Sequence, residues 1–271
     1  MAQRYPEYHR IGAGPANLLS FGAFPDGEGN QLFAPGRVWT AGHDERPEHR
    51  GEGERDRRPR VDALTADDVA AIDESVKHAW YDAARGEGRT QGASADPTPD
   101  LDKRGAYSWV KAPRLHGDVY QVGALARLHV DGSYRGGLSV MDRLLANAQE
   151  TSRIAAAMRG WLDALALDGS GYQHVSTMPA SGEAYSLTEA PRGSLAHWLS
   201  YRDGRVTAYR IITPTAWNAS PRDDREAPGP MEQALLGVEV ADRSQPLEIY
   251  RVIHSFDPCM GCAVHVTCID E

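Results

Sequence analysis

LEIYRVIHSFDPCMGCAVH, residues 247–265, is the stretch from which the rest of the chain can be interpreted. Residues 247–256 are rich in β-branched and aromatic side chains, so we predict a strand there. Pro258 ends that strand and stiffens the approach to the next residue, because proline fixes φ and has no N–H donor. Cys259 and Cys262 then form a C-x-x-C pair, which can chelate one metal ion or form a reversible disulfide.

The cysteine content restricts what this pair can be. The sequence has 3 cysteines, Cys259, Cys262 and Cys268, and all of them follow the predicted strand. A disulfide framework would spread cysteines along the chain and usually use an even number, so a metal or redox site is favoured. With His265 included, three interpretations stay open: a zinc site made from all these groups, a thioredoxin-like redox pair, or half of a larger metal centre.

The sequence between residues 194 and 213 predicts a β-hairpin. The segments LAHWLSYR and RVTAYRIIT flank Asp203-Gly204, a dipeptide suited to a type I′ turn. If the pairing that this turn starts continues to the open end, Arg192 falls opposite Thr215. The segments EAPRG and TPTAWN would then meet, and their cation, hydroxyl and prolines suit a functional site. A hairpin that only packs is equally compatible with this pattern.

A helix is predicted to begin at Thr65. Its hydroxyl and the carboxylate of Asp68 have the spacing of a capping box. Val69, Ile72 and Val76 follow on one face of the expected helix.

The strongest helical pattern runs from about residue 139 to residue 167, with Gly169 just past its end. Its apolar side chains form one stripe, which consists of Met141, Leu144, Leu145, Ala148, Ala155, Met158, Leu162 and Leu165. Because such stripes usually pack against a core, we interpret it as a core helix. The polar stretches 43–60 and 86–105 are expected to be surface loops or insertions within a single unit, residues 1–271.

Composition excludes several classes of function. The chain has 271 residues, 29 Lys+Arg, 38 Asp+Glu and a formal net charge of −9. An acidic chain without a long basic run is not expected to bind nucleic acid. The apolar runs are too short for a transmembrane helix, and the opening MAQRYPEYHR lacks the pattern of a signal peptide. Any location outside the cytoplasm would therefore depend on another component.

Long blocks of the sequence resemble one known family. HSFDPCMGCAVH, residues 254–265, resembles the C-terminal motif of the large, catalytic subunit of nickel–iron hydrogenases. Further blocks resemble this family in its order: NLLSFGAFP, YSWVKAPRLHG, VGALARL, GEAYSLTEAPRGSLAHW, TPTAWNASPRD and GPMEQALLGVEVADRSQPLEIYRVIHSFDPC. The resemblance implies a mixed α+β, helix-dominated fold, the C-terminal portion of the hydrogenase large subunit. EAPRGSLAHW is most similar to the respiratory, membrane-associated uptake group.

The resemblance also implies a set of metal ligands. In this family four thiolates from two C-x-x-C pairs hold nickel, and two of them bridge to an iron that carries cyanide and carbon monoxide. Cys259 resembles the terminal nickel ligand and Cys262 the bridging thiolate, and soft thiolates suit both metals. His265 resembles the ligand of a structural magnesium or iron ion near this centre.

Other residues resemble those that surround the two metals. Pro191 and Arg192 are similar to the pair over the open side, where the guanidinium bonds one cyanide. Because arginine is a poor base, we expect it to assist heterolytic cleavage of dihydrogen electrostatically. Thr215, beside Pro214, resembles the hydroxyl that bonds the second cyanide. Asp257 matches an acidic residue beside the first thiolate, and we expect it to contact Arg192 and to cap the turn.

The family's large subunit is roughly twice as long as this chain, and its first C-x-x-C pair is missing here. We therefore expect the chain to be the C-terminal half of a large subunit, inactive alone. The implied partners are the N-terminal half, an iron–sulfur small subunit, and a maturation endopeptidase that removes residues 266–271; dihydrogen is the implied substrate. The implied location is the outer, periplasmic face of a membrane, reached through a partner subunit. The alternative is a non-catalytic metal-binding or thiol-redox remnant, and Cys268 has no counterpart in the family.

Overall fold

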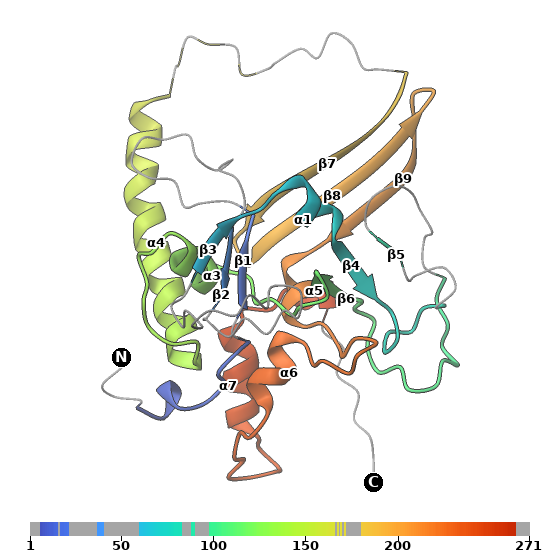
Figure 1. The fold of residues 1–271 in the computed structure, drawn as a ribbon. Coiled ribbons are helices and arrows are strands. Elements are labelled where there is room, and N and C mark those ends of the chain that lie inside the picture. Colours follow the sequence, from blue (N-terminus) through green and yellow to red (C-terminus); the bar gives the residue numbers. More distant parts are fainter. Residues whose placement is uncertain are drawn as a thin grey trace, which may run out of the picture.

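The computed structural model describes part of the chain, and its elements mix helices and strands (Figure 1). The described residues are 6–15, 17–21, 37–40, 60–82, 88–89, 98–165, 167, 169, 171 and 180–263. Of the two predicted polar loops, 43–59 lies outside these residues, and 86–105 is described only at 88–89 and 98–105. Within the described residues, no helix combines the length and apolar character needed to cross a membrane.

The strands form antiparallel sheets of three strands each, in the orders β1-β2-β3, β5-β4-β6 and β7-β8-β9. The strands are β1 (Asn17–Ser20), β2 (Arg37–Thr40), β3 (Arg60–Ala63), β4 (Ile72–Ser75), β5 (Gly88–Arg89), β6 (Ala112–Leu115), β7 (Ser181–Ala190), β8 (Gly193–Arg202) and β9 (Arg205–Ile212). The helices are η1 (Pro6–His9), α1 (Ala66–Ala70), α3 (Ala124–Val130), α4 (Val140–Asp163), α5 (Pro214–Asn218), α6 (Pro230–Leu235), α7 (Leu247–Ser255) and α8 (Met260–Ala263).

A buried apolar cluster joins the sheets near the base of β7-β8-β9. It includes Leu19 of β1, Leu115 of β6, Ala196 of β8 and Ile212 of β9, with the indole of Trp217 from α5 fully buried among them. Burying side chains of this size contributes about 1.5–3 kcal/mol each. The cluster therefore holds the start of β8, the end of β9 and helix α5 against the other two sheets.

The predicted hairpin is present, and its turn has the expected geometry. Asp203 and Gly204 both have positive φ, +49° and +73°, as a type I′ turn requires. The predicted continuation to Arg192 and Thr215 is wrong. A bulge between Ser200 and Tyr201 shifts the register, and pairing ends at Ala196 with Ile212, where the chain turns into α5.

The prediction of a strand over residues 247–256 is wrong, because residues 247–255 form helix α7 and Phe256 is its C-cap. Its exposed side chains, Leu247 and Tyr250, and its buried ones, Val252 and Phe256, recur with helical spacing. Val252 and Phe256 pack with Val140 of α4 and with residues of α6. The gain from burying one face outweighs the weak strand preference of β-branched residues, which is why local composition misled the prediction.

The predicted capping box at Thr65 and Asp68 is present, but the helix that it starts is short. Helix α1 ends at Ala70, and Ile72 lies in strand β4, opposite Leu115 of β6. Glu74, two residues later on the same buried face, pairs with Lys111 and Arg210. Over so few residues, the spacing of the apolar side chains is compatible with both the helical and the strand period. The pairing with β6 selects the strand.

Helix α4 begins where predicted, with a capping box between Ser139 and Asp142, and it ends at Asp163. Its interpretation as a core helix throughout is wrong. The buried residues of α4 all lie between Val140 and Glu150, whereas Met158 and Leu162 are 51% and 69% exposed. The second half of α4 therefore presents apolar side chains on the surface of the described structure.

Candidate metal centre

Pro191 and Arg192 form the whole connection between strands β7 and β8. Ala190 pairs with Gly193 across this two-residue turn. Gly193 has φ +130°, and a Cβ there would lie 2.6 Å from the backbone nitrogen of Gly123 at the start of α3. Only glycine allows both this conformation and this close approach. The turn that carries Arg192 therefore packs closely against the backbone at the start of α3.

The cysteine segment leaves α7 through a left-handed residue. Asp257 has φ +49°, and its N–H donates to the carbonyl of His254, so it ends the helix in the αL conformation. Pro258 follows, and helix α8 then begins at Met260. This tight exit directs Cys259, which is half-buried, back toward the β7–β8 turn and α5.

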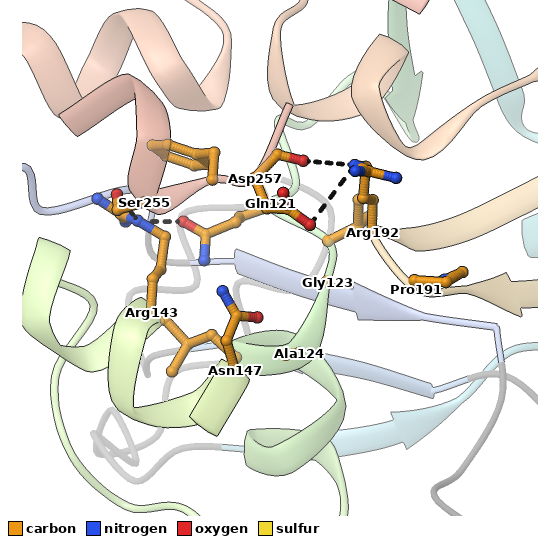
Figure 2. A pocket seen from close by; sticks show the side chains of 12 residues that line it. Gln121, Gly123, Ala124, Arg143, Asn147, Pro191, Arg192, Ser255 and Asp257 are labelled. Carbon is orange, nitrogen blue, oxygen red and sulfur yellow. Dashed lines mark hydrogen bonds and ion pairs between the residues drawn. The ribbon is translucent and has the colours of Figure 1, made fainter. Parts of the chain in front are cut away.

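Arg192 and Thr215 hold this segment from two sides. Nε of Arg192 donates to the backbone carbonyl of Asp257 at 2.9 Å and lies 3.5 Å from its carboxylate Oδ2 (Figure 2). The backbone N–H of Cys259 donates to Oγ1 of Thr215 at 3.1 Å. Thr215 is 3% exposed and follows Pro214, the first residue of α5, whose N-cap is Thr213. The predicted convergence of cation and hydroxyl therefore exists, but it is made through residues 257–259 and not through the hairpin ladder.

The remaining predicted ligands are described incompletely. Cys262 lies in α8, and its side chain is outside the described residues, as are His265 and Cys268. Within the described part of the chain, no three His, Cys, Asp or Glu side chains form a group that could hold a metal ion. Of the predicted ligands, the described side chains supply Cys259 alone.

Sequence reasoning missed Gln121, Arg143 and Asn147, which line a cavity beside the Arg192 turn. A small cavity of about 20 Å³, room for about one water molecule, lies between α3, α4, the β7–β8 turn and the end of α7. Its polar lining includes Gln121, Arg143, Asn147, Arg192 and Asp257 (Figure 2). Most of these residues lie in segments that share no sequence pattern, so only the folded structure shows that they line one cavity.

Arg143 is the buried cation of this cavity. It donates to Oγ of Ser255 at 2.8 Å and to the side-chain oxygen of Gln121 at 3.3 Å, and its guanidinium lies 3.9 Å from the ring centre of Phe256. Burial lowers the pKa of Arg143 to about 9, so it remains a cation at neutral pH. It ties the end of α7, and hence the cysteine segment, to α4.

Asn218 links the start of α3 to helix α5. Its amide accepts from the N–H of Val122 and donates to the carbonyl of Val122, both at 3.0 Å. Since α5 carries Thr215 and the start of α3 supports the Arg192 turn, this pair fixes the hydroxyl relative to the guanidinium. A buried Asn after an aromatic residue gave no sign of this role in the sequence.

The helix and sheet framework that carries the Arg192 turn, the buried Thr215 hydroxyl and the C-x-x-C segment is shared with solved hydrogenase structures. A chain of the Ni-Fe-Se hydrogenase from D. vulgaris Hildenborough matches with a TM-score of 0.78 at 32% identity, over 97% of this chain and 56% of that one. The predicted mixed α+β large-subunit fold is therefore confirmed.

Sequence comparison agrees. The family model of the nickel-dependent hydrogenases matches residues 1–265. The periplasmic [NiFeSe] hydrogenase large subunit of Desulfomicrobium baculatum is 33% identical over 97% of this chain and 52% of that protein. The uptake hydrogenase large subunit of Rhodobacter capsulatus is 32% identical over 73% of this chain and 41% of that protein. The chain belongs to the nickel-dependent hydrogenase family and spans about half the length of these relatives.

Proposed function

We propose that this chain forms part of the catalytic subunit of a nickel–iron uptake hydrogenase, which oxidises dihydrogen reversibly to protons and electrons. The observation that carries the proposal is the position of the cysteine segment. Cys259 is bonded through its N–H to the hydroxyl of Thr215, and the residue two positions earlier, Asp257, is bonded to Arg192. A thiol is thereby held beside a cation and a hydroxyl.

The donor chemistry of these residues fits a nickel–iron centre with cyanide and carbon monoxide on the iron. Cys259 and Cys262 would supply half of the nickel ligands, and because α8 begins directly after Cys259 and contains Cys262, their backbones lie within about one helical turn. The hydroxyl hydrogen of Thr215 and the terminal nitrogens of Arg192 have no hydrogen-bond acceptor among the described residues. They are therefore available to donate to anionic ligands such as two cyanides. His265 would ligate a separate magnesium or iron ion.

When bound, such a centre supplies the Lewis acidity and redox capacity for heterolytic cleavage of dihydrogen. The residues of this chain would position it and shape its field. Arg192 would place a fixed positive charge over the open side of the metals, with Pro191 limiting the freedom of the turn. Asp257 would hold that guanidinium in place, and Pro214 would set the start of the helix that presents Thr215.

The proposal requires partners, because two thiolates leave nickel incompletely coordinated. We infer an N-terminal large-subunit half with the other C-x-x-C pair, an iron–sulfur small subunit that accepts electrons, and an endopeptidase that removes residues 266–271. The small subunit would hold the enzyme at the outer, periplasmic face of a membrane. The names of the relatives, one periplasmic and one an uptake enzyme, support this location and direction.

A second candidate function follows from the ligand count. Among the described residues only one thiol side chain stands at the site, and no acidic or histidine cluster accompanies it. A non-catalytic metal-binding or thiol-redox protein that kept the C-x-x-C pair would look the same there. It would bind zinc or cycle between dithiol and disulfide without nickel.

Co-expression with the inferred half, the small subunit and the maturation machinery separates the two functions. We expect about one nickel per complex, infrared bands of iron-bound cyanide and carbonyl, hydrogen-dependent dye reduction, and loss of residues 266–271 by intact mass. Cys259→Ser should abolish nickel binding, whereas the matched variant Cys268→Ser should retain it, because Cys268 lies in the removed tail. Stoichiometric zinc without nickel, or dye reduction by the chain alone, would contradict the proposal.

A further inference from the structure

The turn that carries Arg192 is held from inside the molecule by another arginine. Arg127 lies in α3 and is 6% exposed. Its Nη1 donates to the carbonyl of Ala190 at 3.1 Å, and its Nη2 donates to the carbonyl of Pro191 at 3.0 Å. One guanidinium therefore binds two consecutive carbonyls, those that lead directly into Arg192.

The guanidinium of Arg127 is itself fixed by two carboxylates. Glu150 of α4 accepts from Nε at 2.6 Å and also from Nη2, and Glu189 of β7 accepts from Nη1 at 2.6 Å. The five N–H donors of Arg127 are thus all engaged. The other oxygen of Glu189 accepts from the hydroxyl of Ser194 at 2.6 Å and from the N–H of Phe21 at 2.8 Å. The network spans α3, α4, the end of β1 and both strands that flank the turn.

This network is costly to bury, so its geometry needs an explanation other than stability. Burial opposes the charge of Arg127, but the hydrogen bonds and charges of Glu150 and Glu189 raise its pKa, while burial raises the pKa of Glu189. Buried ion pairs are often no more stabilising than apolar side chains of the same volume. An apolar side chain, however, could not bind the carbonyls of Ala190 and Pro191.

We propose that Arg127 is a positioning residue of the candidate metal centre, which sets the direction of Arg192 by holding the backbone of its turn. The inference rests on the proposed function. The side chain of Arg192 is 40% exposed, and among the described residues its guanidinium makes polar contacts only with Asp257, so its direction depends on the backbone. Gly123 allows the turn to pack this closely, since a Cβ there would lie 3.2 Å from the carbonyl of Arg192.

Arg127→Lys in the full chain tests whether the bonds from Arg127 to the carbonyls of Ala190 and Pro191 hold the turn. Lysine keeps the charge but offers donors from a single point, so it cannot serve both carboxylates and both carbonyls. We expect backbone hydrogen exchange in residues 188–195 to become roughly tenfold faster, the size expected for losing two hydrogen bonds. This measurement needs no metal.

Arg114→Lys is the matched control. Arg114 is 2% exposed, pairs with Asp223, and donates to the carbonyls of Pro221 and Ala227. Its replacement should speed exchange in residues 220–227 and leave residues 188–195 unchanged. Equal exchange of residues 188–195 in the two variants would overturn the proposal.

In the assembled enzyme, Arg127→Lys should keep normal nickel and iron contents but shift the infrared bands of iron-bound cyanide and lower kcat, whereas Arg114→Lys should do neither. If Arg127→Lys does not fold, Glu150→Gln should give the same changes at smaller size. Unshifted bands and full turnover in whichever variant folds would overturn the inference. Wild-type protein without nickel or cyanide bands would instead overturn the proposed function, and hydrogen exchange would still decide whether Arg127 orders the turn.

Discussion

At the scale of single residues, the candidate site depends on side chains that bind backbone. Arg192 bonds the carbonyl of Asp257, Thr215 accepts from the N–H of Cys259, and Arg127 binds the carbonyls on which the Arg192 turn is built. Backbone groups move little when one surface side chain changes rotamer. A centre assembled in this way keeps its donors in place before any metal arrives, which is the condition for electrostatic stabilisation without reorganisation.

Arg192→Lys should leave metal content intact in the assembled enzyme and lower turnover by roughly a hundredfold or more. Lysine retains the charge but loses the planar set of donors that can contact Asp257 and an anionic ligand together. Hydrogen-dependent dye reduction, normalised to nickel content, measures the effect. Arg202→Lys, at the exposed far end of the same sheet, is the control and should change nothing. Full activity of Arg192→Lys would remove this residue from the mechanism.

At the scale of elements, helix α4 begins on a dense set of local hydrogen bonds. The carboxylate of Asp142 accepts from the N–H groups of Ser139 and Gly137, and from the hydroxyl of Tyr134 at 2.6 Å. Burial opposes ionisation, but the hydrogen bond from the Ser139 hydroxyl, together with those from Tyr134 and the two N–H groups, outweighs it and lowers the pKa of Asp142. The next residue, Arg143, lines the cavity beside the site, so this cap also fixes a site residue.

Asp142→Asn should destabilise the chain by about 1–2 kcal/mol at pH 7. Because the folded-state pKa lies below the unfolded value, the stabilisation by Asp142 is fully present above the unfolded pKa. It is lost as the pH falls through the folded pKa. The difference in urea midpoint between wild type and variant should therefore shrink on acidification. Asp163→Asn, in the exposed last turn of α4, is the control and should be neutral or slightly stabilising. A difference that is constant with pH would contradict this assignment.

At the scale of the whole molecule, apolar surface lies on the outer half of α4. Met158 and Leu162 of α4 are 51% and 69% exposed, and Leu165, two residues past the end of the helix, is 60% exposed. In Figure 1 this half of α4 extends along one flank, away from α7. Contiguous exposed apolar side chains of this kind favour association, so we expect the isolated chain to self-associate.

The double variant Met158→Glu, Leu162→Lys should reduce self-association of the isolated chain without lowering its melting temperature, because neither side chain is buried. Sedimentation velocity at several concentrations measures the effect. Leu101→Lys is the control, since Leu101 is 72% exposed but lies far from α4 in the sequence. Unchanged sedimentation of the double variant would show that another surface drives association.

Features that local chemistry controls could be predicted from the amino-acid sequence. The type I′ turn at Asp203 and Gly204 and the capping box at Thr65 form as predicted, and helix α4 begins at the predicted position, because each feature involves residues within a few positions of one another. Long, specific motifs also identified the family, and they singled out Arg192, Thr215 and Cys259, which the structure brings together around residues 257–259. These features depend on short-range geometry or on residue identity, and neither needs the chain to be folded.

Features that depend on residues distant in sequence became visible only in the folded structure. It made residues 247–255 a helix, because α4 and α6 bury one face, and it made residues 72–75 a strand, because β6 pairs with them. Arg192 and Thr215 do not face each other across the β8–β9 pair, whose register is shifted by a bulge. They are linked instead through residues 257–259. Folding also buried Arg127 beneath the turn, 64 positions from Pro191 in sequence. Such contacts arise only when separate elements pack, since the free energy that selects them comes from surfaces that no single segment contains.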